Sequence, residues 1–392
     1  MTWSYADRKN SIDLFIKTAL ERHNVKINLE NFPTAQYNQT VKVRASANEL
    51  PELLEIHSIT SGYALPLIEQ SMLLPLNGIV NFDRFIPDAV TVNTTADGKT
   101  YCITPQAPLI GLLYNKKVFE ECGVSVPKDK EEFEQVCNAI KAKGIAPIAM
   151  GAKDAWSLHF IAILGVAEHA LKEYSSTDAI AKLKSGELRV NSPGFIKGFS
   201  LIREFYEKGW FQKNPLGTDV NAACEMLANG QAAMHINGTW QYTPITQANP
   251  EADIGFIPLP LNEKGTKSTV VATSGGGLAL KNIEDPEKLE AAKKAIQLYH
   301  DVDMLTALII DMKGIPTHMD VKVEDKFIAE ASAFLTQCVV QANYESGLQP
   351  GHKTNRQTEC QSILSGKRTA EDFLNVYDQE EQELRSAAQQ NS

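Results

Sequence analysis

The chain has 392 residues, which fits two or three domains at roughly 150 residues each. Hydrophobic residues make up 43% of the sequence and charged residues 22%, a composition typical of a globular protein, so disorder is excluded as the main state. The net charge of -10 opposes broad binding to nucleic acid and anionic lipid, and no stretch approaches the roughly 18 consecutive apolar residues of a membrane-spanning helix.

The first part of the chain alternates between predicted helices and strands. Apolar residues recur at helical spacing over 12–20, and they alternate as in a strand over 25–29. Residues 51–56 predict another strand, and residues 63–74 predict another helix. This βα winding predicts a mainly parallel sheet with helices on both faces.

A turn signal and a strongly apolar strand come next. The dipeptide Asp97–Gly98 predicts a tight hairpin. Residues 109–115 predict a strand that passes into a helix at 116–122, which Gly123 closes, and a further helix is expected over 127–143.

Further strands are predicted in the middle of the chain, at 145–151, 232–237, 253–260 and 269–282. Past Pro286 the pattern is almost wholly helical, with a break at 314–316. No repeat, low-complexity tract or long Gly/Ser linker separates the domains, so short crossing segments are expected to join them. The best candidates for these hinges lie near 106–111, 260–268 and 313–318.

The cysteines occur singly. None belongs to a C-x-x-C motif or lies near clustered histidines, so zinc, iron–sulfur and thioredoxin-like sites have no support in the sequence. Most are expected to be buried thiols, and the spacing does not decide whether Cys338 and Cys360 form a disulfide.

Common catalytic motifs are missing from the sequence, among them H-E-x-x-H, G-x-x-x-x-G-K-[ST] and G-x-S-x-G. The run Gly275–Gly276–Gly277 fails as a dinucleotide loop. It predicts a bend where strands approach closely, and the alternative is a set of backbone amides that face a ligand. Acidic residues are abundant, but nothing singles out a carboxylate pair for glycoside hydrolysis.

Two tryptophans follow predicted strands. Trp156 and Trp240 each lie in a glycine-containing turn just past a strand, and ligands of α/β sheets bind at the carboxyl ends of strands. For a tryptophan of unknown role, packing in the core is the more frequent alternative. Trp3 and Trp210 lack such a setting and are expected to be structural.

Four segments, in order, carry a resemblance to a known family. The strongest is Gly230–Trp240, with the pattern G-x-x-A-M-x-x-x-G-x-W, followed by Ile254–Pro260. Leu112–Lys116 and Ser365–Leu374 are the other two. Together they resemble the sugar-binding solute-binding proteins of ABC importers, the family related to maltose-binding protein.

The resemblance implies an α/β fold of two hinge-connected lobes, like that of periplasmic binding proteins, with the ligand in the cleft between lobes. The N-terminal lobe is expected to comprise 1–108 plus 266–314, and the C-terminal lobe 112–262 plus 317–392. Both lobes are then discontinuous in sequence.

The resemblance also implies ligand-binding residues. Trp240 and Trp156 match stacking aromatics of the family, because a tryptophan covers the apolar face of a sugar ring, and Asp154 matches a family carboxylate. Asp7 and Arg8 resemble an acidic–basic pair that contacts sugar hydroxyls, with a solvated loop salt bridge as the alternative.

Other candidates occupy positions where relatives contact the ligand with different residue types. His57 and Ser58 follow a predicted strand, and His57 is alternatively a structural histidine. Gln36 matches a polar position, whereas its neighbour Tyr37 is expected in the core. Gly275 and Gly276 complete the candidates.

No third stacking aromatic is evident around His352 and Lys353. The departures from maltose-binding protein argue against maltodextrin and leave the identity of the sugar open.

The implied function is capture of a mono- or oligosaccharide by hinge closure and its delivery to the permease subunits of an ABC importer. No enzyme activity, cofactor or metal is expected, and neither is a nucleic-acid partner. The protein is expected to be a monomer outside the cytoplasm, held at the membrane only through a lipid anchor on a signal segment that this sequence lacks. The alternatives are a non-sugar solute on the same fold, a carbohydrate-active enzyme and a cytosolic sensor.

Overall fold

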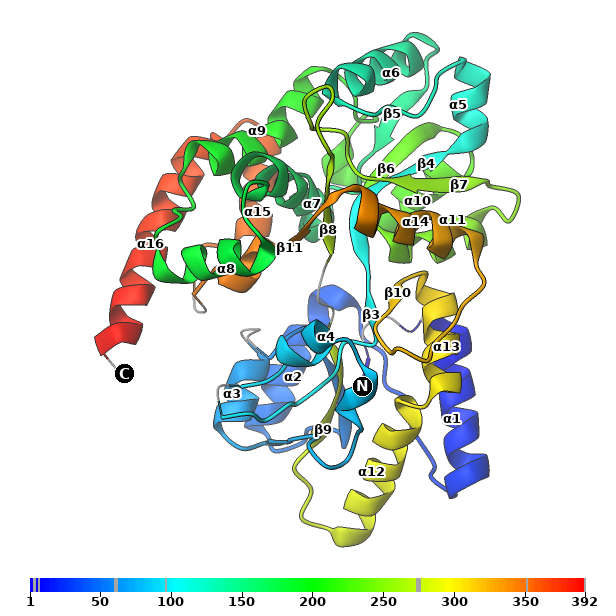
Figure 1. Cartoon of the computed structure of the whole chain (residues 1–392), viewed down its shortest axis with the longest axis vertical. Coiled ribbons are helices and arrows are strands. Elements are labelled where there is room, and N and C mark those ends of the chain that lie inside the picture. Colours follow the sequence, from blue (N-terminus) through cyan, green and yellow to red (C-terminus); the bar gives the residue numbers. More distant parts are fainter. Residues whose placement is uncertain are drawn as a thin grey trace. The chain divides into compact units, whose positions relative to one another are not determined.

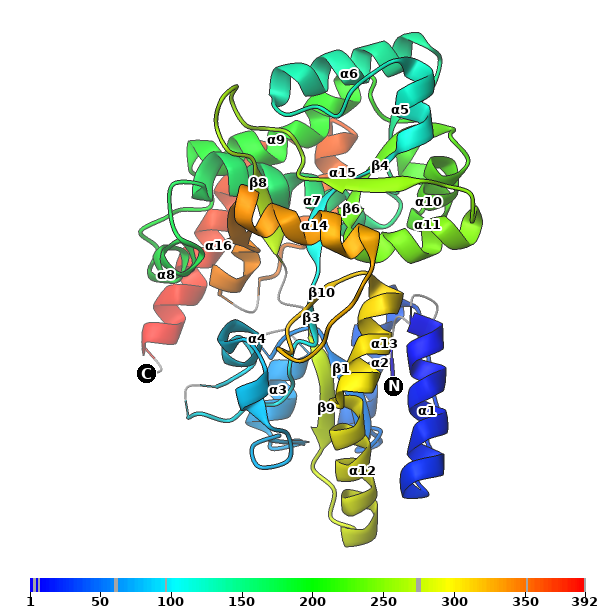
Figure 2. The same cartoon turned by 45° about the vertical axis from the view of Figure 1, so that its right-hand side comes forward.

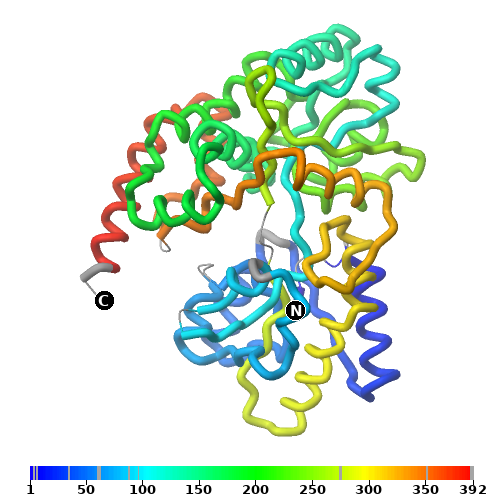
Figure 3. The backbone as a smooth tube through the Cα atoms, in the orientation of Figure 1, coloured from blue at the N-terminus to red at the C-terminus, as the bar shows by residue number. Residues whose placement is uncertain are grey.

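The structure is a computed structural model that describes residues 1–2, 5, 8–59, 63–95, 97–272, 276–349 and 352–390, most of which are coloured in Figure 3. The chain forms two units, each built from two separate segments. Unit 1 comprises Met1–Pro108 and Ser274–Ile328, and unit 2 comprises Leu109–Thr273 and Ala329–Ser392. Each unit combines a sheet with helices, which confirms the α/β class expected from the sequence. The exact lobe boundaries stay a prediction.

The sheet of unit 1 has β9 (Gly277–Lys281) in the middle. It pairs antiparallel with β1 (Leu53–Ile56) and with β2 (Leu73–Leu74). A separate two-stranded ladder joins β3 (Gln106–Ala107) to β10 (Ile315–Pro316), also antiparallel. The three-stranded sheet of β1, β9 and β2 is therefore completed by β9, which follows β1 by more than two hundred residues.

Helices cover the unit 1 sheet, and α1 (Lys9–His23) contacts α12 (Pro286–Tyr299) and α13 (Val302–Met312), as both views show (Figures 1 and 2). The Phe15 ring packs edge-on against the Tyr299 ring at a centroid distance of 5.5 Å. The remaining helices of this unit are α2 (Thr34–Ser46), α3 (Ala64–Glu69) and α4 (Pro87–Thr91).

The sheet of unit 2 is built around β4 (Leu109–Asn115), every residue of which is buried except Tyr114. On one side β4 pairs with β6 (Ala232–Gly238), and β5 (Ala146–Ala149) lies beyond β6. The other strands are β7 (Ile254–Ile257), β8 (Thr269–Ala272) and β11 (Val339–Ala342).

Strand directions differ from the mainly parallel sheet that the sequence predicts. β4 runs antiparallel to β6, β7 and β8, whereas β5 is parallel to β6 and β11 is parallel to β8. In unit 1, β9 likewise runs against both of its neighbours. β4 and β9 each begin within three residues of the point where the chain crosses into their unit. Each therefore enters its sheet directly from the other unit, without a preceding crossover helix, and runs antiparallel to its neighbours.

Other elements also depart from expectation. No strand forms at 25–29, where the side chains of Val25 and Ile27 pack on a core that includes Phe15. The predicted helix at 63–74 ends at Glu69, and the following Leu73–Leu74 joins the sheet as β2. The expected helical region past Pro286 contains β11.

The helices of unit 2 surround its sheet. α7 (Ala155–Val166) contacts β4, β6 and β8, and α10 (Val220–Ala228) contacts β4, β5 and β6 (Figure 1). The others are α5 (Lys116–Cys122), α6 (Lys130–Ala142), α8 (Ser176–Ser185), α9 (Pro193–Glu207), α11 (Tyr242–Ala248), α14 (Lys326–Gln337, which begins in unit 1), α15 (Arg356–Leu364) and α16 (Ala370–Gln390).

All six cysteines lie in the described ranges and carry free thiols, so Cys338 and Cys360 are not bonded to each other. Among the described helices, none has the length and apolar character needed to cross a membrane.

Candidate functional site

Trp156 and Trp240 lie just past the carboxyl ends of two adjacent parallel strands. β5 pairs with β6 so that Ala149 lies opposite His235. Trp156 is the second residue of α7, the helix that follows β5, and Trp240 is the middle residue of a 3₁₀ turn that follows β6. Both side chains are half-buried, so each indole keeps part of its surface accessible.

A third aromatic side chain connects the two tryptophans. The Phe160 ring contacts the Trp156 ring and the Trp240 ring edge-on, each at a centroid distance of 5.7 Å. Phe160 is half-buried and lies four residues after Trp156, on the same side of α7. Phe160 was not among the site residues predicted from the sequence, although its spacing of four residues from Trp156 is a local signal that the two share a helix face.

The Trp240 indole packs on a glycine. A Cβ atom at Gly238 would lie 1.9 Å from Cζ3 and 2.1 Å from Cη2 of the Trp240 ring. Only a residue without a side chain therefore leaves room for the indole in this orientation.

A buried chain of hydrogen bonds begins between β5 and β6, the two strands that precede the tryptophans. Nδ1 of His235 lies 2.8 Å from the carbonyl oxygen of Ala149. Because a carbonyl oxygen only accepts, Nδ1 carries the proton and Nε2 is an acceptor. The amide nitrogen of Asn237 donates to this Nε2 at 3.1 Å. Burial lowers the pKa of His235 to about 4, so the ring is neutral at pH 7.

The same chain continues into α7. The Asn237 amide nitrogen also lies 3.2 Å from Oγ of Ser157, the third residue of that helix. Oδ1 of Asn237 accepts from the backbone N–H of Gly238 at 2.9 Å. His235, Asn237 and Ser157 are each fully buried. None of these three polar residues was predicted as a site residue from the sequence.

Asp154 stands immediately before α7 and connects it to α10. Its Oδ2 accepts from the backbone N–H of Val220, the first residue of α10, at 2.9 Å. The Asp154 side chain is half-buried, and a carboxylate that accepts one hydrogen bond retains lone pairs for others. Asp154, Trp156 and Trp240 therefore belong to one region of unit 2.

The remaining sequence candidates lie in unit 1. Arg8 is 5% exposed and forms a salt bridge with Glu55 on β1, and its guanidinium also donates to Thr2 Oγ1 at 3.0 Å. The Arg8–Glu55 pair is buried. Asp7 lies outside the described residues.

His57 follows β1 and is half-buried. Its backbone N–H donates to the Tyr63 hydroxyl at 2.9 Å, and its Nδ1 lies 2.8 Å from the same oxygen. Burial lowers the pKa of His57 to about 4. The neighbouring Ser58 is also half-buried.

Gln36 and Tyr37 lie on α2 with opposite exposures. Gln36 is exposed, whereas Tyr37 is fully buried and donates a hydrogen bond to the carbonyl oxygen of Glu55 at 2.8 Å. The core position expected for Tyr37 is therefore confirmed.

The described part of the glycine run lies where backbone segments approach each other closely. A Cβ at Gly276 would lie 1.4 Å from the carbonyl oxygen of Ile56, and one at Gly277 would lie 2.2 Å from that of Ile103. Gly275 lies outside the described residues.

The region around His352 is held by α16. The His352 ring stacks on Tyr377 at a centroid distance of 4.0 Å, and its Nε2 lies 2.7 Å from Glu381 Oε2. Lys353 is exposed.

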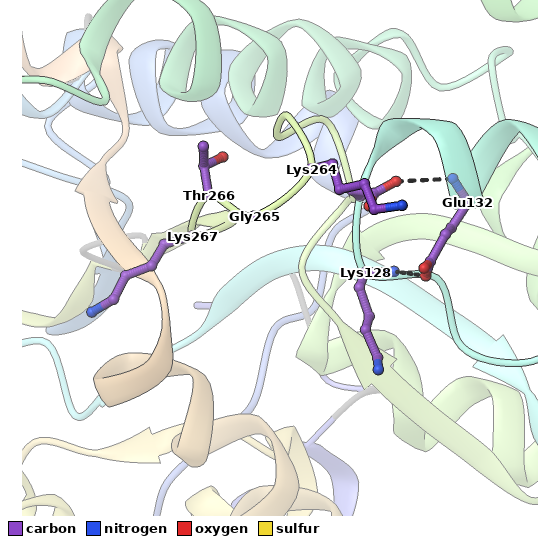
Figure 4. Close-up of a pocket in the computed structure, with 7 residues that line it drawn as sticks. Lys128, Glu132, Lys264, Gly265, Thr266 and Lys267 are labelled. Atoms are coloured by element: carbon purple, nitrogen blue, oxygen red, sulfur yellow. Dashed lines mark hydrogen bonds between the residues drawn. The ribbon is translucent and has the colours of Figure 1, made fainter.

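Figure 4 shows a separate surface groove of unit 2, open to solvent and lined by Lys128, Asp129, Glu132, Lys264, Gly265, Thr266 and Lys267. This lining has no aromatic side chain, and it shares no residue with the tryptophan region. Within the described ranges, no three His, Cys, Asp or Glu side chains gather closely enough to hold a metal ion.

Solved structures with the same fold cover almost the whole chain. A chitin oligosaccharide binding protein has a TM-score of 0.84 at 21% identity, over 98% of this chain and 98% of its own. A solute-binding protein, RafE, in complex with raffinose has a TM-score of 0.78 at 20% identity, over 97% of this chain and 98% of its own.

A relative by sequence is the multiple sugar-binding protein of Streptococcus mutans. It is 28% identical over 331 residues, which are 77% of this chain and 74% of the relative. The profile of the bacterial extracellular solute-binding proteins matches residues 15–336, which is most of the chain. The chain therefore belongs to the bacterial extracellular solute-binding protein family.

Proposed function

We propose that this protein binds a carbohydrate and delivers it to an ABC importer. The observation that carries the proposal is the pair of half-buried tryptophans, Trp156 and Trp240, joined through Phe160 at the carboxyl ends of two parallel strands. Sugar rings have apolar C–H faces that stack on indoles, and hydroxyl rims that need polar partners.

The relatives support an oligosaccharide as the ligand class. One is named a multiple sugar-binding protein, and structures of the same fold are a chitin oligosaccharide binding protein and a complex with raffinose. In unit 2, Trp156 and Trp240 would stack on sugar rings while the Asp154 carboxylate accepts a hydroxyl hydrogen bond.

The proposed ligand contacts in unit 1 are Asp7, Arg8, Gln36, His57, Ser58, Gly275 and Gly276. Among these, Gln36 has an exposed side chain, and His57 and Ser58 are half-buried, so these are the first to test. Arg8 would reach a ligand only by giving up its buried pairing with Glu55.

The proposed cycle is reversible capture by hinge closure, without covalent chemistry, followed by transfer to permease subunits. The family is extracellular, and its matched relatives are binding proteins. We place the protein outside the cytoplasm as a monomer, with attachment to the membrane only through a lipid anchor.

The test is isothermal titration calorimetry against raffinose, stachyose, N,N′-diacetylchitobiose, chitotriose, maltotriose, galactose and N-acetylglucosamine. At least one sugar should bind and change the intrinsic tryptophan fluorescence. Chromatography after long incubation should return each sugar intact, whereas new products would identify a carbohydrate-active enzyme. No heat and no fluorescence change with any sugar would count against the proposal and favour a non-sugar solute.

A further inference from the structure

We propose that His235, Asn237 and Ser157 form a positioning chain that sets the separation of Trp156 and Trp240 and so favours oligosaccharides over single sugars. This inference rests on the proposed function. The three residues are not ligand contacts in this scheme, because all are fully buried.

The hydrogen bonds of the positioning chain have a single consistent assignment. The Ala149 carbonyl makes His235 Nδ1 a donor, which leaves Nε2 as an acceptor for the Asn237 amide. The second amide hydrogen goes to Ser157 Oγ, and Asn237 Oδ1 accepts from Gly238 N–H. A flipped amide would place Oδ1 against the lone pair of Nε2, so the chain defines one geometry.

Two members of the positioning chain lie next to the tryptophan-bearing segments. Ser157 directly follows Trp156 in the first turn of α7. Asn237, in the middle of the chain, accepts a hydrogen bond from the N–H of Gly238, the glycine on which the Trp240 indole packs. A shift of the hydrogen bonds therefore moves one tryptophan-bearing segment relative to the other.

The Phe160 ring also restrains the separation of the two indoles, since it contacts both of them. An oligosaccharide that stacks on both indoles needs them at a fixed separation, whereas a monosaccharide needs only one. Loosening the positioning chain should therefore weaken oligosaccharide binding more than monosaccharide binding.

The experiment uses Ser157→Ala and Asn237→Leu in the full chain. Ser157→Ala removes only the hydroxyl and is the variant that should fold without difficulty. Gln341→Leu is the matched control, because Gln341 is also a buried amide of unit 2 that donates two hydrogen bonds, at 3.0 Å and 2.7 Å, but to Leu171 and Tyr174.

The first readout needs no ligand. The four tryptophans are labelled with 5-fluorotryptophan, and their ¹⁹F resonances are assigned by single Trp→Phe variants. Ser157→Ala should move the resonances of both Trp156 and Trp240 while that of Trp210 stays in place. Gln341→Leu should move neither Trp156 nor Trp240.

The second readout is calorimetry with raffinose against galactose, and with chitotriose against N-acetylglucosamine. Ser157→Ala should weaken trisaccharide binding roughly threefold to tenfold, the worth of one hydrogen bond, with a smaller effect on the monosaccharide. Gln341→Leu should leave this ratio unchanged even where it lowers thermal stability.

Unmoved resonances in Ser157→Ala and Asn237→Leu would overturn the inference. So would moved resonances with an unchanged trisaccharide-to-monosaccharide ratio. If the parent protein binds no sugar but both resonances move, the proposed function fails while the positioning of the two tryptophans by this chain is supported.

Discussion

Gly238 lies directly beneath the Trp240 indole, so closely that a Cβ would approach Cζ3 to 1.9 Å. Gly238→Ala should therefore displace the indole, weaken binding of the best sugar more than tenfold and destabilise unit 2 by about 1–3 kcal/mol through overpacking. Calorimetry and urea unfolding measure the two effects.

The control for this change is Gly265→Ala in the same unit, where a Cβ meets nothing within 4 Å and only the φ of +80° is unfavourable. This variant should lose about 1 kcal/mol of stability and bind sugar normally. Parental affinity in Gly238→Ala would show that the orientation of Trp240 does not matter for binding.

Removing the stacking surface itself is the second test. Trp240→Ala should weaken sugar binding at least tenfold, because the binding site loses the flat apolar surface on which the C–H face of the sugar would stack. Tyr206→Ala removes an aromatic side chain of unit 2 that is 43% exposed on α9, outside the tryptophan region, and should bind as the parent does. Equal affinity of Trp240→Ala and the parent would refute the stacking role.

The buried pair of Arg8 and Glu55 gives a third prediction. Glu55→Gln leaves the guanidinium without its carboxylate in a buried site, so the free energy of unfolding should fall by about 3–5 kcal/mol. The double variant Arg8→Met/Glu55→Leu replaces the pair by apolar groups and should recover most of this loss in urea unfolding.

The same double variant distinguishes a structural role of Arg8 from a role in contacting the ligand. Recovered stability with parental sugar affinity would show that Arg8 serves only the interior of unit 1. Recovered stability with lost affinity would support the hydroxyl contact expected from the sequence.

The fourth prediction concerns pH. Burial lowers the pKa of His300 to about 4, below its ordinary value of 6.5, with Ile296 as its hydrogen-bond partner and His318 as a neighbouring titratable group. As pH falls, the unfolded chain binds the proton of this histidine before the folded chain does. The contribution of His300 to the free energy of unfolding is therefore fully present above pH 6.5. It is lost between pH 6.5 and about 4, by about 3 kcal/mol.

His300→Leu should flatten the slope of unfolding free energy against pH by up to about 1.4 kcal/mol per pH unit in that window. Urea unfolding at several pH values gives the slope. A slope that stays parental in His300→Leu would mean that another group controls acid sensitivity.

Local sequence patterns predicted the elements that depend on local chemistry. The strand at Leu109–Asn115 and the helix at Lys116–Cys122 were predicted with the bounds observed, because an apolar run and the Gly123 cap define them within a few residues. Strand direction was not predictable in this way. It depends on which distant segment supplies β4 and β9, and periodicity carries no information about that.

The residues of the candidate site likewise fall into those that a local pattern marks and those that only tertiary packing brings together. Trp156 and Trp240 were found because a strand end followed by a glycine-containing turn is a local pattern. The contact of Phe160 with Trp240, and the hydrogen bond between Asn237 and Ser157, join residues that lie 80 positions apart along the chain. The packing of α7 against β6 brings these residues together, so no local pattern marks these two contacts.

The central position of β9 has a consequence for the order of folding. The strand that joins β1 to β2 is made of Gly277–Lys281, so the sheet of unit 1 stays incomplete until all of Leu109–Thr273 has been synthesised. Such high contact order slows folding, because a long loop must close before the pairing gains any free energy. A ribosome-bound chain that ends before β9 should therefore carry a protease-sensitive first segment beside a second unit that has already begun to fold.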